Sequence, residues 1–368
     1  MKKALLISLT IMCYSLSAQD INKNFERWTI AEKAINITGM DLSPDGKTVA
    51  MVCGKNQPVL LYNMAERTII KEIDVSSKWM GYNIYYSQKG SYLLLQEKKT
   101  ETSFKKSKQA DYKVIDVAQG KVIHSFNKIN DVKISFDESQ MVTLENGTVH
   151  FRDIMTGKTT KSFQPEEACN ALAISPDGQE IAVVIKPSKK EVMMVGKVAA
   201  NKKVIKATAK TKHMIAIYST ETLMIEKVVQ EFYDNINLLT YTDDGDRLLS
   251  FNMASNSYIN VALPNQGYEP TREGYLSRTS MQPEFGYSGN QKYFAVATVE
   301  LFPSLNIYEV ETGSMLDLYN TKMKIWKNAK KGIYAGTNTS FVFLPGDKYI
   351  LMSYGNSLIK WKFKKSNQ

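Results

Sequence analysis

Apolar residues recur in seven short alternating stretches along the chain, and each stretch is interrupted by the same kind of tight turn. The clearest turn is Ser43-Pro44-Asp45-Gly46, and similar turns lie at 87–90, 135–138, 175–178, 242–245, 288–291 and 344–347. Apolar residues stand six and four residues before the last position of each turn, and another follows three residues after it. This period-two alternation predicts a strand, a tight turn and a second strand, seven times over.

The turn residues have a physical reason to be there. Proline presets the first backbone angle of a turn, aspartate or asparagine bonds its own backbone, and glycine accepts a positive φ without steric strain. The segments 43–46 and 175–178 both read Ser-Pro-Asp-Gly. These residue types are therefore typical of tight turns.

The spacing of the turns predicts the fold class. They are 40 to 67 residues apart, and a third strand follows in most units, for example at 59–62 and 148–153. Four strands per repeat of about 40 to 45 residues is typical of propeller blades. The chain is therefore predicted to be all-β, a seven-bladed β-propeller of four-stranded antiparallel blades spanning residues 19–363, with a short tail at 364–368.

The last unit lacks a fourth strand, because the chain ends at Gln368 soon after its third. Residues 25–31 precede the first blade and belong to no unit of their own. We expect this N-terminal stretch to complete the last blade and to close the ring, which removes the unpaired edge of an open array.

The turns and the ends of the third strands carry a resemblance to a known family. Ile115-Asp116, and Arg152-Asp153 followed by Thr156-Gly157-Lys158, stand where WD-repeat proteins have Trp-Asp and a Thr-Gly turn. The chain resembles a divergent bacterial member of the WD-repeat-like propellers over residues 25–363. None of its histidines follows glycine, so the buried Ser-His-Asp network of that family is not expected. The resemblance implies a fold that serves interaction platforms as well as enzymes.

Residues 1–18 are predicted to be an export signal. Lys2 and Lys3 precede an apolar run at 4–12, and small residues end the segment at Ala18. The run is too short to span a bilayer, and no later run is apolar enough, so no transmembrane segment is expected after signal removal. The predicted location is the periplasm or the exterior. Without Lys2 and Lys3 the chain has 45 basic and 37 acidic residues, which favours anionic partners.

Three lysine-rich segments interrupt the blade pattern at 98–108, 186–213 and 322–331, and together they carry nineteen lysines. The middle one alternates lysine with small residues on one side of a turn, which predicts a β-hairpin insertion. All three occupy links that share one face of a propeller built of antiparallel blades. The residues expected to form a contact surface there are Lys98, Lys105, Lys106, Lys202, Lys203, Lys206, Lys210, Lys212, Lys324, Trp326, Lys330 and Lys331.

Polar residues mark the predicted start of the inner strands, at the mouth of the central channel. They are Thr38, Asn130, Asp131, Asn170, Asn237, Glu284 and Thr339. Such a ring of amides, hydroxyls and carboxylates fits a small polar ligand. Alternatively, these side chains and water satisfy the strand ends.

Catalytic and cofactor motifs are absent from the sequence. There is no Gly-x-Ser-x-Gly elbow, His-Glu-x-x-His pair, Cys-x-x-Cys pair, phosphate loop or dinucleotide fingerprint, and no cofactor or metal is predicted. We expect a non-catalytic interaction or assembly module whose lysine-rich face binds another envelope protein, an anionic polysaccharide or a lipid surface. Nucleic acid fits the charge but not an exported protein.

Two alternatives remain at this point. One is a propeller hydrolase that resembles the bacterial sugar-lactone hydrolases, with Asp131 and Glu284 holding a divalent metal at the channel mouth. The other is a passive scaffold that a partner grips by its rim.

Overall fold

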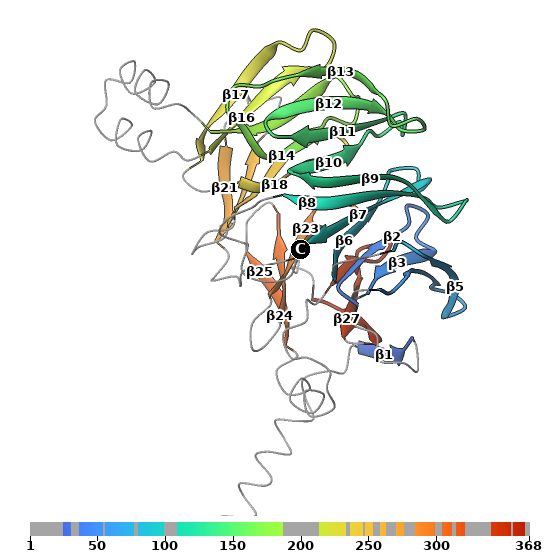
Figure 1. The fold of residues 1–368 in the computed structure, drawn as a ribbon. Coiled ribbons are helices and arrows are strands. Elements are labelled where there is room, and N and C mark those ends of the chain that lie inside the picture. Colours follow the sequence, from blue (N-terminus) through green and yellow to red (C-terminus); the bar gives the residue numbers. More distant parts are fainter. Residues whose placement is uncertain are drawn as a thin grey trace, which may run out of the picture.

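The computed structural model of this protein describes residues 25–30, 37–53, 56–76, 80–98, 109–186, 213–232, 236–245, 247–252, 258–262, 270–275, 284–298, 304–310, 314–320, 340–354 and 356–364. Within these ranges the chain forms twenty-eight β-strands and no helix. The strands make seven sheets, each of four antiparallel strands. The prediction of an all-β chain with seven four-stranded units is confirmed, and the sheets are consistent with the blades of a propeller (Figure 1).

We number the sheets in chain order. Sheet 1 contains β2 (Gly39–Leu42), β3 (Thr48–Val52), β4 (Val59–Asn63) and β5 (Thr68–Ile73). Sheet 2 contains β6 (Met80–Tyr86), β7 (Tyr92–Lys98), β8 (Ala110–Asp116) and β9 (Lys121–Ile129). Sheet 3 contains β10 (Asp131–Ile134), β11 (Gln140–Glu145), β12 (Thr148–Asp153) and β13 (Thr159–Phe163).

The remaining sheets follow the same order. Sheet 4 contains β14 (Ala168–Ile174), β15 (Glu180–Ile185), β16 (His213–Ser219) and β17 (Ile225–Phe232). Sheet 5 contains β18 (Ile236–Tyr241), β19 (Leu248–Asn252), β20 (Tyr258–Ala262) and β21 (Pro270–Tyr275). Sheet 6 contains β22 (Glu284–Tyr287), β23 (Tyr293–Thr298), β24 (Ser304–Glu309) and β25 (Met315–Asn320). Sheet 7 contains β26 (Phe341–Phe343), β27 (Tyr349–Tyr354), β28 (Ser357–Lys362) and β1 (Phe25–Thr29).

The predicted turns join the first two strands of all seven sheets. Their last positions have φ between 50° and 82°, and each donates its N–H to the carbonyl three residues earlier at 2.8–3.1 Å. The positions are Gly46, Gly90, Glu138, Gly178, Gly245, Gln291 and Asp347. The backbone is therefore left-handed at all seven positions, including the three that are not glycine.

A hydroxyl–carboxylate pair stabilises most of these turns. In the first, Ser43 Oγ donates to Asp45 Oδ1 at 2.6 Å and accepts the N–H of Thr48 at 2.9 Å. The hydrogen bond from Ser43 lowers the pKa of the Asp45 carboxyl. Equivalent bonds occur in the turns that begin at Ser135, Ser175, Thr242 and Ser288, where an aspartate or asparagine two residues later takes the role of Asp45.

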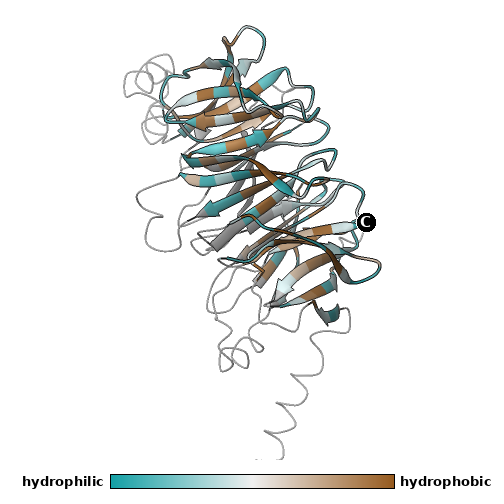
Figure 2. Ribbon diagram, turned by 45° about the vertical axis from the view of Figure 1, so that its right-hand side comes forward, coloured by the Kyte–Doolittle hydropathy of each residue, from teal (hydrophilic) through white to brown (hydrophobic). Residues whose placement is uncertain are grey.

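The second strand of several sheets is buried along most of its length. Four consecutive residues of β3 and of β11 are buried, as are five of β15. Because successive side chains of a strand point to opposite faces, both faces of these sheets are covered. In Figure 2 the hydrophobic residues are concentrated in the strands, and the turns between them are largely hydrophilic.

Six apolar clusters of described side chains lie between neighbouring sheets. Sheets 1 and 2 meet at Ala50 and Leu93, sheets 2 and 3 at Val114 and Met141, and sheets 3 and 4 at Phe151 and Ile181. Sheets 4 and 5 meet at Ala182 and Leu239, and sheets 5 and 6 at Leu249 and Phe294. The largest cluster joins sheets 6, 7 and 1 around Ala295, Met352 and Met51. Each sheet therefore packs on the next, and sheet 7 packs on sheet 1.

Strand β1 supplies the fourth strand of sheet 7, as the sequence predicts for residues 25–31. It pairs antiparallel with β28, from Phe25 opposite Trp361 to Thr29 opposite Ser357 (Figure 1, blue beside red). It also contacts sheet 1, because Trp28 Nε1 donates to the hydroxyl of Tyr62 at 2.8 Å and the Arg67 guanidinium lies 4.6 Å from the centre of the Trp28 ring. The strand therefore connects the two ends of the described chain.

No helix in the described part of the chain combines the length and the apolar character needed to cross a bilayer.

Packing between adjacent turns can be tested with two glycines in identical Ser-Pro-Asp-Gly turns. Gly46 and Gly178 have φ of 72° and 71°, so alanine strains the backbone by about 1 kcal/mol at either position. A Cβ on Gly46 would lie 2.6 Å from Pro345 Cγ, whereas nothing lies within 4 Å of one on Gly178. We expect Gly46→Ala to lower the free energy of unfolding by about 1–3 kcal/mol more than Gly178→Ala. Equal losses in chemical denaturation would show that the turns do not pack on one another.

The contribution of β1 to stability can be tested at Trp28. Trp28→Ala removes a hydrogen bond to a buried hydroxyl and a cation–π contact, so we expect it to lower the free energy of unfolding by about 2 kcal/mol. Thr29→Ala, at an exposed position of the same strand, should change it by about 0.5 kcal/mol or less. Denaturation of the two variants side by side makes the comparison, and a Trp28→Ala protein as stable as Thr29→Ala would contradict it.

Candidate functional site

The lysine-rich segments begin and end at strand ends that the structure describes. Strand β7 ends at Lys98 and β8 begins at Ala110, β15 ends at Ile185 and β16 begins at His213, and β25 ends at Asn320 and β26 begins at Phe341. Lys98 is described by its backbone alone. The other expected contact residues lie outside the described residues: Lys105, Lys106, Lys202, Lys203, Lys206, Lys210, Lys212, Lys324, Trp326, Lys330 and Lys331. The predicted hairpin over 186–213 also lies outside them, apart from its two ends.

Contacts between turns show how the sheets are oriented. The turn of sheet 1 packs on Pro345 of sheet 7, and a Cβ on Gly90 of sheet 2 would lie 3.1 Å from Pro44 of sheet 1. The Glu138 carboxylate of sheet 3 accepts the N–H of Lys89 in sheet 2 at 2.7 Å. The Asp347 carboxylate of sheet 7 accepts the N–H of Gly289 in sheet 6 at 2.9 Å. The turns of sheets 6, 7, 1, 2 and 3 therefore lie side by side.

Sheet 4 continues the same orientation. Lys161 of β13 donates to the carbonyl of Thr220 after the third strand of sheet 4, and Lys71 of β5 donates in the same way to Val117 of sheet 2. Asp131, at the start of β10, accepts the N–H of Leu172 in β14. The strand ends that bound all three lysine-rich segments therefore lie on one side, opposite the turns of these six sheets. We call this side the insert side and the opposite one the turn side.

Side chains on the first strands connect one sheet to the next. The first strand of each sheet has one edge that is not paired within its own sheet. Ser340 Oγ accepts a hydrogen bond from the backbone N–H of Met40 at 2.7 Å. Asp41 Oδ2 accepts one from the N–H of Tyr86 at 2.7 Å, and Asp131 Oδ2 accepts one from the N–H of Leu172 at 3.1 Å. These bonds satisfy backbone donors that would otherwise lie unpaired at the edge.

The residues predicted at the channel mouth differ in their hydrogen bonds and in whether their side chains are described. The Thr38 side chain is buried and its hydroxyl donates within sheet 1 to the Val52 carbonyl at 3.3 Å. Asn170 Nδ2 donates to the Ile236 carbonyl at 3.0 Å and so bridges sheets 4 and 5. For these two residues, satisfaction of strand ends is the role that the structure shows. Asn237 and Glu284 lie on β18 and β22 with their backbone alone described, and Thr339 lies outside the described residues.

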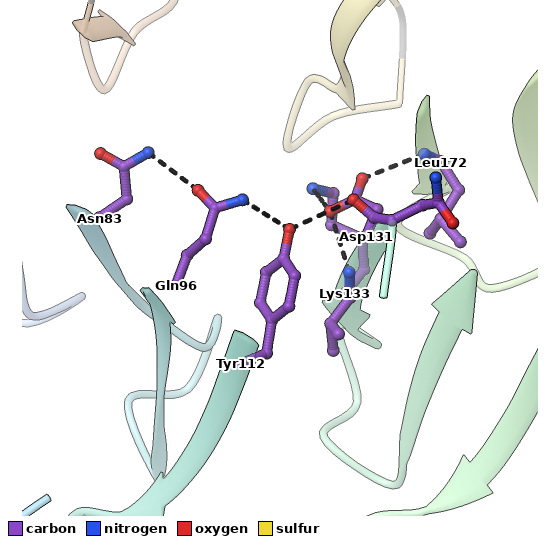
Figure 3. Close-up of polar contacts among 8 residues, drawn as sticks. Asn83, Gln96, Tyr112, Asp131, Lys133 and Leu172 are labelled. Atoms are coloured by element: carbon purple, nitrogen blue, oxygen red, sulfur yellow. Dashed lines mark hydrogen bonds and ion pairs between the residues drawn. The ribbon is translucent and has the colours of Figure 1, made fainter. Parts of the chain in front are cut away.

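Asp131 and Asn130 belong to a larger group that the sequence did not reveal. We call it the inner-strand polar cluster, and it consists of Asn83, Gln96, Tyr112, Asn130, Asp131 and Lys133. Figure 3 labels five of them and shows Asn83, Gln96 and Tyr112 of sheet 2 leading to Asp131 and Lys133 of sheet 3. Asn83 Nδ2 donates to Gln96 Oε1 at 3.2 Å, and Gln96 Nε2 donates to the Tyr112 hydroxyl at 2.6 Å. The Tyr112 hydroxyl reaches the Asn130 carbonyl at 3.4 Å.

The electrostatics of this cluster are set by burial and by one ion pair. Lys133 Nζ lies 3.1 Å from Asp131 Oδ1, which also accepts the N–H of Val132 at 2.9 Å. Burial raises the pKa of Tyr112 well above its ordinary value, and the Asp131 charge raises it further. Tyr112 is therefore a neutral hydrogen-bonding group at physiological pH.

The metal-site alternative can be compared with this geometry. Both oxygens of Asp131 already accept protein donors, and the Lys133 ammonium competes with a dication for one of them. Among the described residues no three His, Cys, Asp or Glu side chains are placed to share a metal. The predicted metal site also requires Glu284, whose side chain lies outside the described residues.

Among the described carboxyls of the first strands, Asp41 has the most strongly perturbed pKa. Burial raises its pKa from 3.8 to about 7, against the opposing effect of the N–H donors of Tyr86 and Leu42. Neither Asp41 nor the cluster side chains Asn83 and Gln96 could be found from sequence, because their partners belong to other strands or sheets. The one available signal is a charged residue between the apolar Met40 and Leu42.

Comparison with known proteins adds no assignment: no family model matches the chain, and no curated protein matches it significantly.

The raised pKa of Asp41 gives a pH dependence of stability. Between pH 3.8 and about 7 the folded protein holds a proton at Asp41 that the unfolded chain releases, so stability from this group is fully present below pH 3.8 and is lost as the pH rises through about 7. We expect the wild type to gain on the order of 2 kcal/mol relative to Asp41→Asn when the pH falls from about 8 to about 5. Denaturation of both proteins at the two pH values measures this, and a constant difference between them would contradict the assignment.

Proposed function

We propose that the seven sheets are the blades of a closed β-propeller ring, a divergent bacterial relative of the WD-repeat propellers. Support comes from the apolar clusters between successive sheets, including the one that joins sheets 6, 7 and 1. The pairing of β1 with β28 supports closure by the N-terminal strand. Second strands with four or five consecutive buried residues support it as well, because each sheet then needs a neighbour on both faces.

On this ring, the proposed function is that of an exported, non-catalytic interaction or assembly module. Its insert side binds a partner in the bacterial envelope that carries many negative charges. The observation that carries the proposal is the common location of the strand ends that bound the three lysine-rich segments. Nineteen lysines in those segments would concentrate positive charge on one side of the molecule.

The chemistry of the segments limits the kind of partner. Their basic residues are lysines, whose compact and strongly hydrated ammonium groups attract negative charge without the paired geometry of arginine. Such a surface fits a partner with repeated charges, namely an acidic polysaccharide, an anionic lipid surface or an acidic patch on another envelope protein. Steering by this field raises the rate of encounter and weakens with salt.

The first-strand residues support a non-catalytic role. Asp131, Asp41 and Asn170 each bond the backbone of the next sheet, so their polar atoms are engaged in holding sheets together. The alternative of a metal-dependent hydrolase would require Asp131 to exchange these bonds for a metal, and no observation favours it.

The proposed function predicts salt-dependent binding to a polyanion. We expect the mature protein to bind polygalacturonate, with affinity falling at least about tenfold between about 50 and about 200 mM salt, and not to bind neutral dextran. Changing Lys202, Lys203, Lys206, Lys210 and Lys212 together to glutamine should weaken binding and flatten the salt dependence, because counterion release falls with the number of charges. Titration calorimetry and sedimentation with the polymer measure both effects.

Two controls separate charge from structure. The same five lysines changed to arginine keep the charge and should keep the affinity. Glutamine at Lys47, Lys292 and Lys348, which are exposed on the turn side, should leave the affinity unchanged. Binding that is indifferent to salt, or equal losses on the two sides, would contradict the proposal.

A further inference from the structure

The first strands divide the seven sheets into a polar group and a group with small or apolar side chains. The difference lies in the side chain at the position five residues before the last residue of each turn. Sheets 1, 2 and 3 carry Asp41, Tyr85 and Lys133 there, whereas sheets 4 to 7 carry Ala173, Thr240, Gly286 and Val342. Ala173 and Val342 are buried in apolar clusters between sheets, so the large polar side chains at this level belong to sheets 1 to 3.

The inner-strand polar cluster has hydrogen-bonding groups to spare. Asn130 is partly exposed, and among the described residues its side-chain amide makes no hydrogen bond, while its backbone N–H and carbonyl bond to Leu144 and Tyr112. Asn83 is also partly exposed and donates one amide hydrogen to Gln96, so its amide oxygen remains available. Lys133 uses one of its three ammonium hydrogens on Asp131. The cluster therefore offers both donors and acceptors.

The net charge of the cluster is zero. Its only ionised members are Asp131 and Lys133, and they form an ion pair at 3.1 Å. An anionic ligand would meet the Asp131 carboxylate, and a cationic ligand would meet the Lys133 ammonium. Charge therefore disfavours both kinds of ion and leaves a neutral polar ligand as the best match.

An aromatic ring lies beside the amides. Tyr85 is two residues after Asn83 on β6, on the same face of the strand, and 42% of its surface is exposed. It lies close enough to Tyr112 to influence the pKa of that hydroxyl. A tyrosine ring offers an apolar surface to C–H groups next to the hydrogen-bonding amides.

We propose that the inner-strand polar cluster is a binding site for a neutral, polyhydroxylated ligand, that is, a carbohydrate. Each hydroxyl of such a ligand both donates and accepts, which matches the side-chain amide of Asn130 and the amide oxygen of Asn83. The C–H surface of a sugar ring packs against Tyr85. The site is distinct from the lysine-rich segments and does not depend on the proposed polyanion partner.

The test is a binding comparison with neutral and charged trisaccharides. Maltotriose, cellotriose and N,N′,N″-triacetylchitotriose are the neutral probes, while trigalacturonate and chitotriose carry negative and positive charge. Saturation-transfer NMR and titration calorimetry on the mature protein measure binding. We expect at least one neutral probe to bind, with an affinity that does not fall with salt, and the charged probes to bind at least about tenfold more weakly.

Variants locate the site. Asn130→Ala should weaken binding about tenfold or more without altering the melting temperature, because the amide has no partner among the described residues. Asn83→Ala should weaken it as well. Thr240→Ala, on the first strand of sheet 5 and outside the cluster, is the control and should leave the affinity unchanged.

Three outcomes would overturn the proposal: no neutral probe binds, a charged probe binds best, or Asn130→Ala and Thr240→Ala bind alike. Removal of residues 190–210 distinguishes this site from the polyanion surface. It should abolish binding to polygalacturonate and leave the neutral trisaccharide bound with unchanged affinity.

Discussion

The arrangement of this protein depends on the burial of both faces of its sheets. A four-stranded sheet with apolar side chains on both faces is stable only when another layer covers each face. Strands such as β3, β11 and β15, with four or five consecutive buried residues, impose that condition on sheets 1, 3 and 4. Sheet 1 meets it by packing on sheet 2 and on sheet 7, whose sequence lies at the far end of the chain. Sheets from the two ends of the described chain are thereby brought into contact.

Polar side chains form the hydrogen bonds between sheets that apolar packing cannot supply. Apolar contact between sheets does not satisfy the backbone N–H groups on the free edge of a first strand. Ser340, Asp41 and Asp131 supply acceptors from the preceding sheet, and Asn170 supplies a donor to the following one. The two proposed binding regions are accordingly different in kind. One is a strongly charged set of segments that the sheets carry on one side, and the other is an electrically neutral cluster built from the edges themselves.

The sequence predicts those features whose residue pattern lies within a short stretch of the chain. The turns ending at Gly46 and Gly178 follow from Ser-Pro-Asp-Gly alone, and the same register located turns that end in Glu138 and Gln291. The role of residues 25–31 followed from a deficit, because seven units need twenty-eight strands and the last unit was one strand short. The sequence predicts Thr38 and Asn170 as residues at strand starts. It does not show whether their side chains bind a ligand or, as the structure has it, form hydrogen bonds within the protein. The hydrogen-bonded chain from Asn83 to Tyr112 was missed, because its members belong to three strands whose register is fixed only in the folded sheet.

The pairing of β1 with β28 has a consequence for the order of folding. Arg27 and Ser357 are hydrogen-bonded although 330 positions separate them in the chain. Strand β1 therefore cannot pair until β28 has been synthesised, and no N-terminal fragment contains all the strands of sheet 7. Closing so long a loop is entropically unfavourable and slow, so sheets 1 to 6 can assemble from local pairs while the final seam forms late. Such a molecule acquires its complete set of contacts only after β28 has been synthesised.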